Sequence, residues 1–171
     1  AAVTSPALHV KGVDVGALKA DLTFDSGVGN IMIDGDVNQS EGGHSHVTGY
    51  IRPAGGAGID LTFEAERLRA DFMGKFMDTL FDHVQGRATG KVRLFGVFEE
   101  GVTVEGEADV EDGNIGVRLL GTSYSFSHRL TFTPTSIIFS KIPMRDDEGH
   151  TGIVDGVIRH RFFDNFDLDL T

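Results

Sequence analysis

Apolar residues alternate with polar or small residues along most of the chain. The alternation is clear from Leu18 to Phe24, from Val47 to Ile51 and from Ile59 to Phe63, and it returns throughout the second half. A period of two places successive side chains on opposite faces of a β-strand. Turn sequences such as Asp34-Gly35 and Asp112-Gly113-Asn114 separate the alternating segments. We therefore expect an all-β fold of about a dozen short strands.

One segment departs from this period. Between Glu66 and Gly86 the apolar residues recur at helical spacing, with Leu68, Phe72 and Phe76 among them. Gly86 stands where a helix C-cap glycine would. We predict a short amphipathic helix over residues 65–86 that packs on the sheet, between a first β unit (1–64) and a second β unit (87–171) of one continuous elongated domain.

The two β units carry a sequence repeat. Val47 matches Val154, and the matches continue at the same offset of 107 positions, the difference between 154 and 47. The further matched pairs are Gly49 with Gly156, Ile51 with Ile158, Arg52 with Arg159, Asp60 with Asp167 and Leu61 with Leu168. An ungapped match of this kind predicts repeated structural units.

Composition narrows the possible functions. Glycine makes up 23 of the 171 residues, well above the usual ~7%, which agrees with many strands and tight turns. The net charge is −11 and the sequence has no run of basic residues, so nucleic acid is a poor partner. The chain has no cysteine, which excludes thiolate metal sites and thiol catalysis. It lacks an initiator Met, and we interpret it as a piece of a longer protein.

The second half contains a series of short motifs. They are Gly86, Gly90, Val92, Leu94 and Gly96; Val104 to Gly113; Tyr124 to Phe126; Asp146, Gly149, Val154, Gly156 and Ile158; and the ending F-x-N-F-D-L-D-L at Phe163 to Leu170. Through these motifs the second half resembles the C-terminal region of the TamB family, AsmA-like proteins of the Gram-negative envelope. The resemblance covers Leu61 to Thr171 well and the first sixty residues more loosely. One departure is Glu99-Glu100-Gly101, where family members often carry a proline.

The resemblance implies an elongated sheet curved lengthwise into a taco-like half-pipe with an apolar concave face. It implies a place in the periplasm, within a protein anchored in the inner membrane by a segment outside this chain. The implied functions are phospholipid movement between the two membranes and, with an outer-membrane barrel partner, the assembly of outer-membrane proteins.

The alternation itself supports a groove, because an open apolar face normally marks a binding surface. The residues that we expect to line a groove for lipid tails or nascent strands are Ile51, Leu61, Phe63, Val92, Leu94, Val104, Val117 and Leu168. The alternative is that curvature closes this face and that these residues form an ordinary core.

A second function fits the same pattern. The terminal strands, expected at Leu18 to Phe24 and Phe166 to Leu170, could accept a nascent outer-membrane β-strand by β-augmentation, or self-associate through their edges. The alternative is that they pair with neighbouring repeats in the full-length protein. A third alternative is a structural spacer.

Catalytic and metal-binding motifs are weak. His44 and His46 lie one apart in a Gly-rich turn, where strand alternation would put both on one face as metal ligands require, but the sequence fixes no third ligand. The carboxylates at Asp34 to Asp36 and Met144 to His150 do not follow the ligand spacing of calcium loops. No serine has a nucleophile-elbow context, and no phosphate-binding loop is present. We therefore predict no enzyme activity, no metal and no cofactor.

Overall fold

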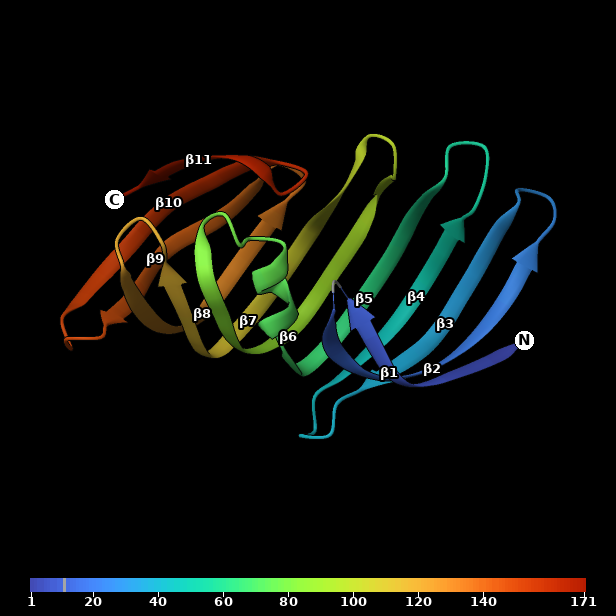
Figure 1. The fold of residues 1–171 in the computed structure, drawn as a ribbon, viewed down its shortest axis with the longest axis horizontal. Helices are drawn as coiled ribbons and strands as arrows, with labels where there is room; N and C mark the ends of the chain where they lie inside the picture. Colours follow the sequence, from blue (N-terminus) through green and yellow to red (C-terminus); the bar gives the residue numbers. More distant parts are fainter. Residues whose placement is uncertain (11) are drawn as a thin grey trace.

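The computed structural model describes residues 1–10 and 12–171, and within them it forms one open antiparallel sheet. Eleven strands follow one another in chain order from one edge to the other, and Figure 1 shows the sheet curling, with the two chain ends far apart. The strands are β1 (Ala2–Val10), β2 (Val13–Asp25), β3 (Asn30–Asn38), β4 (His44–Arg52), β5 (Gly58–Arg69), β6 (Phe81–Val97), β7 (Gly101–Val117), β8 (Thr122–Thr133), β9 (Ser136–Asp146), β10 (Thr151–Arg161) and β11 (Asp164–Leu170). The predicted all-β, half-pipe fold class is confirmed.

The register explains how alternation becomes a two-faced sheet. Residues directly opposite one another in neighbouring strands point to the same face, and we call such a series across the sheet a rung. Leu61 lies opposite Leu94, and Leu94 lies opposite Val104, so apolar residues meet apolar residues. Burial of this face in a hydrophobic core then fixes the register, because a slip of one residue would turn every apolar side chain toward water.

The apolar side of the sheet holds two clusters. The first is built on Val15, Val37, Val47 and Leu61, at the N-terminal end. The second, larger cluster contains Phe81 and, from the C-terminal strands, residues such as Phe126, Ile137, Ile142 and Ile158. Each strand pairs only with its neighbours in the chain, so each cluster is supported mainly by its own set of consecutive strands.

Glycines allow neighbouring strands to approach closely. Gly49 has φ +139°, and a Cβ placed on it would lie 2.0 Å from the carbonyl oxygen of Asp60. Its repeat counterpart Gly156 has φ +140° and the same 2.0 Å conflict, with Asp169. The repeat therefore preserves a backbone position that only glycine occupies without strain. Asp34-Gly35 and Asp112-Gly113-Asn114, both predicted as turns, instead lie inside β3 and β7.

The predicted helix over 65–86 is wrong in its extent. The structure has only a five-residue 3₁₀ helix, η1 (Asp71–Lys75). Residues before it extend β5 to Arg69, and residues after it begin β6 at Phe81. Gly86, predicted as a C-cap, lies within β6 at a break in the register between Gln85 and Arg87.

Tertiary pairing accounts for the short helix. The flanking residues gain inter-strand hydrogen bonds, with Leu68 opposite Ala88 and Val84 opposite Ile115. Gly74 lies within η1, and Ala70 supplies no side-chain hydrogen bond at the N-terminus of η1, so the intrinsic preference for helix is weak. The apolar stripe still faces the sheet: Phe72 packs on the first cluster, while Phe76 packs on the second.

The predicted boundaries after residues 64 and 86 fall inside β5 and β6, so the sheet runs through both without interruption. Within the described residues, no helix has the length and apolar character needed to cross a membrane.

Candidate functional site on the apolar face

The N-terminal half of the apolar face contains a continuous apolar rung. Phe24 lies opposite Ile31, Ile31 opposite Ile51, and Ile51 opposite Ile59. Each of these three pairs joins two neighbouring strands, whose backbones lie about 4.8 Å apart in a β-sheet. The next residue of the rung is Gly96, opposite Ile59, where the absence of a side chain leaves the sheet surface lower.

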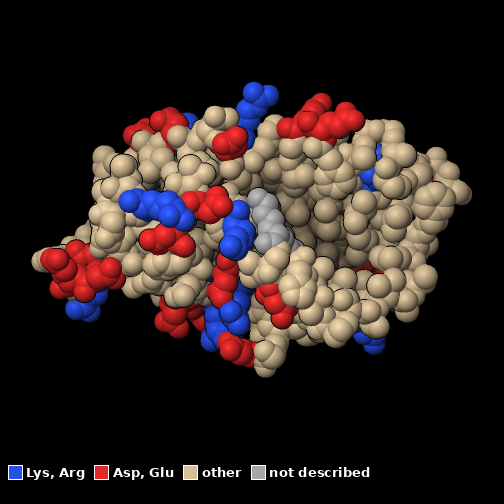
Figure 2. Space-filling view, viewed as in Figure 1, with Lys and Arg blue, Asp and Glu red and all other residues tan. Residues whose placement is uncertain are grey.

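The rung is only partly covered. Phe24 is 64% exposed, and the three isoleucines are intermediate between buried and exposed. Figure 2 shows a hollow over strands β3 to β5, and almost all of its visible surface belongs to uncharged residues. A surface that is apolar, uncharged and only partly covered favours an apolar ligand.

The groove-lining residues predicted from sequence fall into separate groups. Leu61, Leu94 and Val104 form one rung, and Phe63 lies opposite Val92 in the next. Ile51 belongs to the partly covered rung described above. Val117 instead packs against the second cluster. Leu168 lies on β11, the last strand of the sheet, opposite Ile158. The structure therefore does not join all eight into one continuous surface.

Their burial also differs. Leu61 and Val104 are each only 8% exposed. Leu8 of the curled β1–β2 hairpin and Phe72 of η1 pack on the first cluster, so that part of the half-pipe is filled by the chain itself. Ile51, Phe63, Val92 and Leu94 remain partly exposed.

Sequence reasoning did not assign Phe24, Ile31 and Ile59 to the groove, although they complete the partly covered rung. The alternation from Leu18 to Phe24 already placed Phe24 on an apolar face. What was missing was the register between distant strands, which a single sequence does not contain.

The opposite face of the sheet is polar and held by ion pairs. Arg93 donates from Nε and Nη2 to the two carboxylate oxygens of Asp60, at 2.8 and 2.7 Å, and from Nη1 to Glu105 at 2.9 Å. The hydrogen bond from Arg93 holds the pKa of Asp60 below its ordinary value. Arg129 makes a similar bidentate contact with Asp109, at 2.8 and 3.0 Å.

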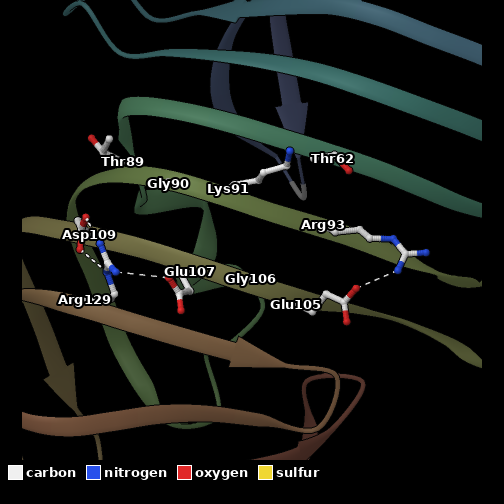
Figure 3. Close-up of a pocket in the computed structure, with 10 residues that line it drawn as sticks. All are labelled: Thr62, Thr89, Gly90, Lys91, Arg93, Glu105, Gly106, Glu107, Asp109 and Arg129. Atoms are coloured by element: carbon white, nitrogen blue, oxygen red, sulfur yellow. Dashed lines mark hydrogen bonds and ion pairs between the residues drawn. The ribbon is translucent and has the colours of Figure 1, made fainter.

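A depression of about 450 Å³ lies on this polar face, between Arg93 and Arg129 (Figure 3). Its third cation, Lys91, pairs with Glu64 at 2.9 Å. Because each basic side chain that lines the depression has a carboxylate partner, the depression has no unpaired positive charge with which to attract an anion. We interpret these pairs as cross-strand contacts within the sheet.

His44 and His46 also lie on the polar face. Both contact the same Asp36 oxygen, from His44 Nε2 at 3.0 Å and from His46 Nδ1 at 3.1 Å. Across residues 1–10 and 12–171, no group of three or more His, Cys, Asp or Glu side chains is arranged to hold a metal ion.

Comparison with known proteins adds no identification: no protein-family model, no curated protein and no solved structure matches this chain.

Proposed function

We propose that the apolar concave face carries or shields phospholipid acyl chains, as one segment of a protein that bridges the inner and outer membranes. The observation that carries this proposal is the partly covered rung formed by Phe24, Ile31, Ile51 and Ile59. The resemblance to the TamB family supports it and suggests a periplasmic location and an outer-membrane barrel protein as partner.

The physical basis is the hydrophobic effect. Transfer of a methylene group from water to an apolar surface gains ~0.8 kcal/mol, so a long acyl chain is held without specific polar contacts. A surface of this kind binds chains in any of several positions along the rungs, which suits movement along a half-pipe better than tight binding at one position.

The test is native mass spectrometry of the purified protein, with extraction and identification of bound lipid. Phe24→Asp places a charge in the partly covered rung, and the 64% exposure of Phe24 predicts little cost to folding. Thr23→Asp is the matched control, because Thr23 is the exposed neighbour in β2 and points to the other face. Ile51→Asp tests the centre of the same rung.

We expect phospholipid to co-purify with the protein and with Thr23→Asp, and to fall at least about fivefold in Phe24→Asp, because a charge on an apolar surface opposes acyl binding. Circular dichroism checks that each variant is folded. Lipid-free protein, or equal lipid in the two β2 variants, would refute the proposal for this face.

A second function, the binding of nascent outer-membrane strands by β-augmentation, uses a different part of the molecule. The observation that favours it is the edge strand β11, on which Leu168 and Leu170 remain exposed. The other predicted edge, Leu18 to Phe24, lies in β2: it pairs with β3 along its whole length, and with β1 from Leu18 to Asp21.

A further inference from the structure

A second depression lies on the polar face, next to the depression between Arg93 and Arg129. Its volume is about 220 Å³, and Arg93 lines both depressions. Figure 3 shows Arg93 at the end of the first depression that is far from Arg129. The residues that line the second depression belong to β4, β5, β6 and the β4–β5 turn. These strands lie in the interior of the sheet, so the depression involves neither end of the chain.

Two aromatic side chains form the walls of the second depression. Tyr50 of β4 and Phe95 of β6 both lie opposite Asp60 of β5, so the three side chains point to the same face. Two strand spacings separate the backbones of Tyr50 and Phe95, about 10 Å. Gly58, two residues before Asp60, has no side chain, so backbone forms part of the floor. We call this depression the slot.

The slot has room for one ring. A cavity of ~150 Å³ is enough to hold benzene, and the slot is larger, at about 220 Å³. The surplus volume admits a small polar substituent. Tyr50 and Phe95 offer ring faces and edges on both sides, which favours a flat aromatic guest over a flexible chain.

Arg52 is held in place at the slot. Its Nε donates to Oδ1 of Asn30 at 3.3 Å, and Asn30 is only 6% exposed. The guanidinium carbon of Arg52 lies 5.7 Å from the centre of the Tyr50 ring. Because these two contacts position the guanidinium before a ligand arrives, binding costs less conformational entropy.

The charge balance of the slot differs from that of the first depression. Arg93 is balanced by Asp60 and Glu105, and it donates to both oxygens of Asp60. In the part of the chain that the structure describes, no carboxylate pairs with Arg52, and its two Nη groups donate to no protein atom. A planar pair of charged N–H donors matches a carboxylate or a phosphate, which accepts two parallel hydrogen bonds.

We propose that the slot binds an aromatic compound that carries a carboxylate or phosphate group. The ring lies between Tyr50 and Phe95, and the anionic group accepts hydrogen bonds from Nη1 and Nη2 of Arg52. The slot lies on the face opposite the partly covered rung, so this binding site goes beyond acyl-chain binding and does not depend on it.

The test is an NMR titration of the ¹⁵N-labelled protein with four probes at equal ionic strength. Phenyl phosphate has both the ring and the charge, inorganic phosphate has only the charge, and phenol has only the ring. Glucose 6-phosphate replaces the aromatic ring with a sugar. We expect phenyl phosphate to bind at least about tenfold more tightly than each of the other three, because each of them loses one set of contacts. The chemical-shift changes should lie at residues 50–60 and 93–97.

Two variants separate the contacts. Arg52→Gln should weaken the binding of phenyl phosphate at least about tenfold and leave that of phenol unchanged. Tyr50→Leu should weaken the binding of phenyl phosphate and leave that of inorganic phosphate close to its native level. Arg161→Gln is the matched control, because Arg161 also lies over an aromatic ring, Phe162, at 6.0 Å. Within the described residues Arg161 pairs with no carboxylate, and it does not line the slot. Thermal unfolding checks that each variant is folded.

Each result supports or overturns the proposal. The absence of a saturable shift at the slot with phenyl phosphate means that no such site exists. If inorganic phosphate or phenol binds as tightly as phenyl phosphate, charge or ring alone explains the binding. If glucose 6-phosphate binds more tightly, the aromatic preference is wrong. Equal losses in Arg52→Gln and Arg161→Gln would indicate unspecific attraction to basic side chains, which also overturns the proposal. None of these results changes the acyl-chain proposal, which is tested at Phe24.

Discussion

Two histidines respond to pH in opposite directions. His160 is 5% exposed, its ring stacks on Phe163 with centroids 4.5 Å apart, and its Nδ1 accepts a hydrogen bond from the Phe163 N–H at 3.2 Å. The neutral ring must therefore carry its proton on Nε2, which is buried and has no hydrogen-bond partner. Burial lowers the pKa of His160.

His46 has the opposite environment. Asp36 of β3 and Glu64 of β5 lie directly opposite it on the polar face. The hydrogen bond with Asp36 raises the pKa of His46. Protonated His46 continues the alternation of charge across these strands, whereas a proton on His160 would place a charge among aromatic rings, including Phe166.

These shifts predict opposite effects in variants. Since the pKa of His160 is lowered, its neutral form stabilises the fold above the unfolded value of ~6.5, and this stability is lost as pH falls below it. The pKa of His46 is raised, so its contribution is complete below ~6.5 and is lost as pH rises through the folded pKa. On moving from pH 8 to pH 5, His160→Phe should gain stability relative to the native protein, and His46→Gln should lose it. Urea unfolding at both pH values measures the change, and a pH-independent difference for either variant contradicts its assigned environment.

The repeated glycines give a second prediction at the residue scale. Alanine at Gly49 or Gly156 places a Cβ 2.0 Å from a backbone carbonyl oxygen at a φ that L residues rarely adopt, which costs about 1–3 kcal/mol of unfolding free energy. Gly49→Ala should be the more costly, because β4 is enclosed by β3 and β5, whereas β11 can shift outward from Gly156.

Gly152→Ala is the control in this series. No atom lies within 4 Å of a Cβ at Gly152, so its substitution should change stability by less than about 0.5 kcal/mol. Thermal unfolding ranks the three variants, and equal losses at all three would show that close strand approach does not explain the repeat.

At the scale of elements, alternation predicted the strands because a period of two has a direct structural meaning. The helix prediction failed for a related reason. Leu68, Phe72, Phe76 and Leu80 do all face the apolar side, but a stripe at helical spacing does not reveal that Leu68 hydrogen-bonds in a strand. Partners for β5 and β6 lie far along the chain, and no local pattern contains them.

For the candidate site, too, the sequence predicted which face a side chain lies on but not how deeply it is buried. Alternation placed Ile51 and Leu94 on an apolar face, and the structure has them there with partial exposure. It did not indicate that Leu61 would be buried, because the cluster to which Leu61 belongs includes residues of other strands and is packed against by Leu8 and Phe72. Curling of the β1–β2 hairpin is a property of the assembled sheet.

At the scale of the whole molecule, a sheet whose strands pair only with their chain neighbours should have stability that is approximately a sum of local terms. The two apolar clusters then unfold with partial independence. Ile142 of β9 is fully buried in the second cluster, and Val37 of β3 is 2% exposed in the first cluster. Ile142→Ala should lower the unfolding free energy of the second cluster by about 2–5 kcal/mol.

Hydrogen exchange read by mass spectrometry distinguishes local from global loss. We expect Ile142→Ala to reduce the hydrogen-exchange protection of β8 to β10 and to leave the protection of β2 to β4 close to its native level. We expect Val37→Ala to reduce the protection of β2 to β4 and to leave that of β8 to β10 close to its native level. The reason is that each strand of the described sheet hydrogen-bonds only with its neighbours in the chain, so β5 to β7 separate the two sets of strands. If either substitution lowered protection evenly across all strands, the sheet would be a single cooperative unit, and the two apolar clusters could not be perturbed separately by mutation.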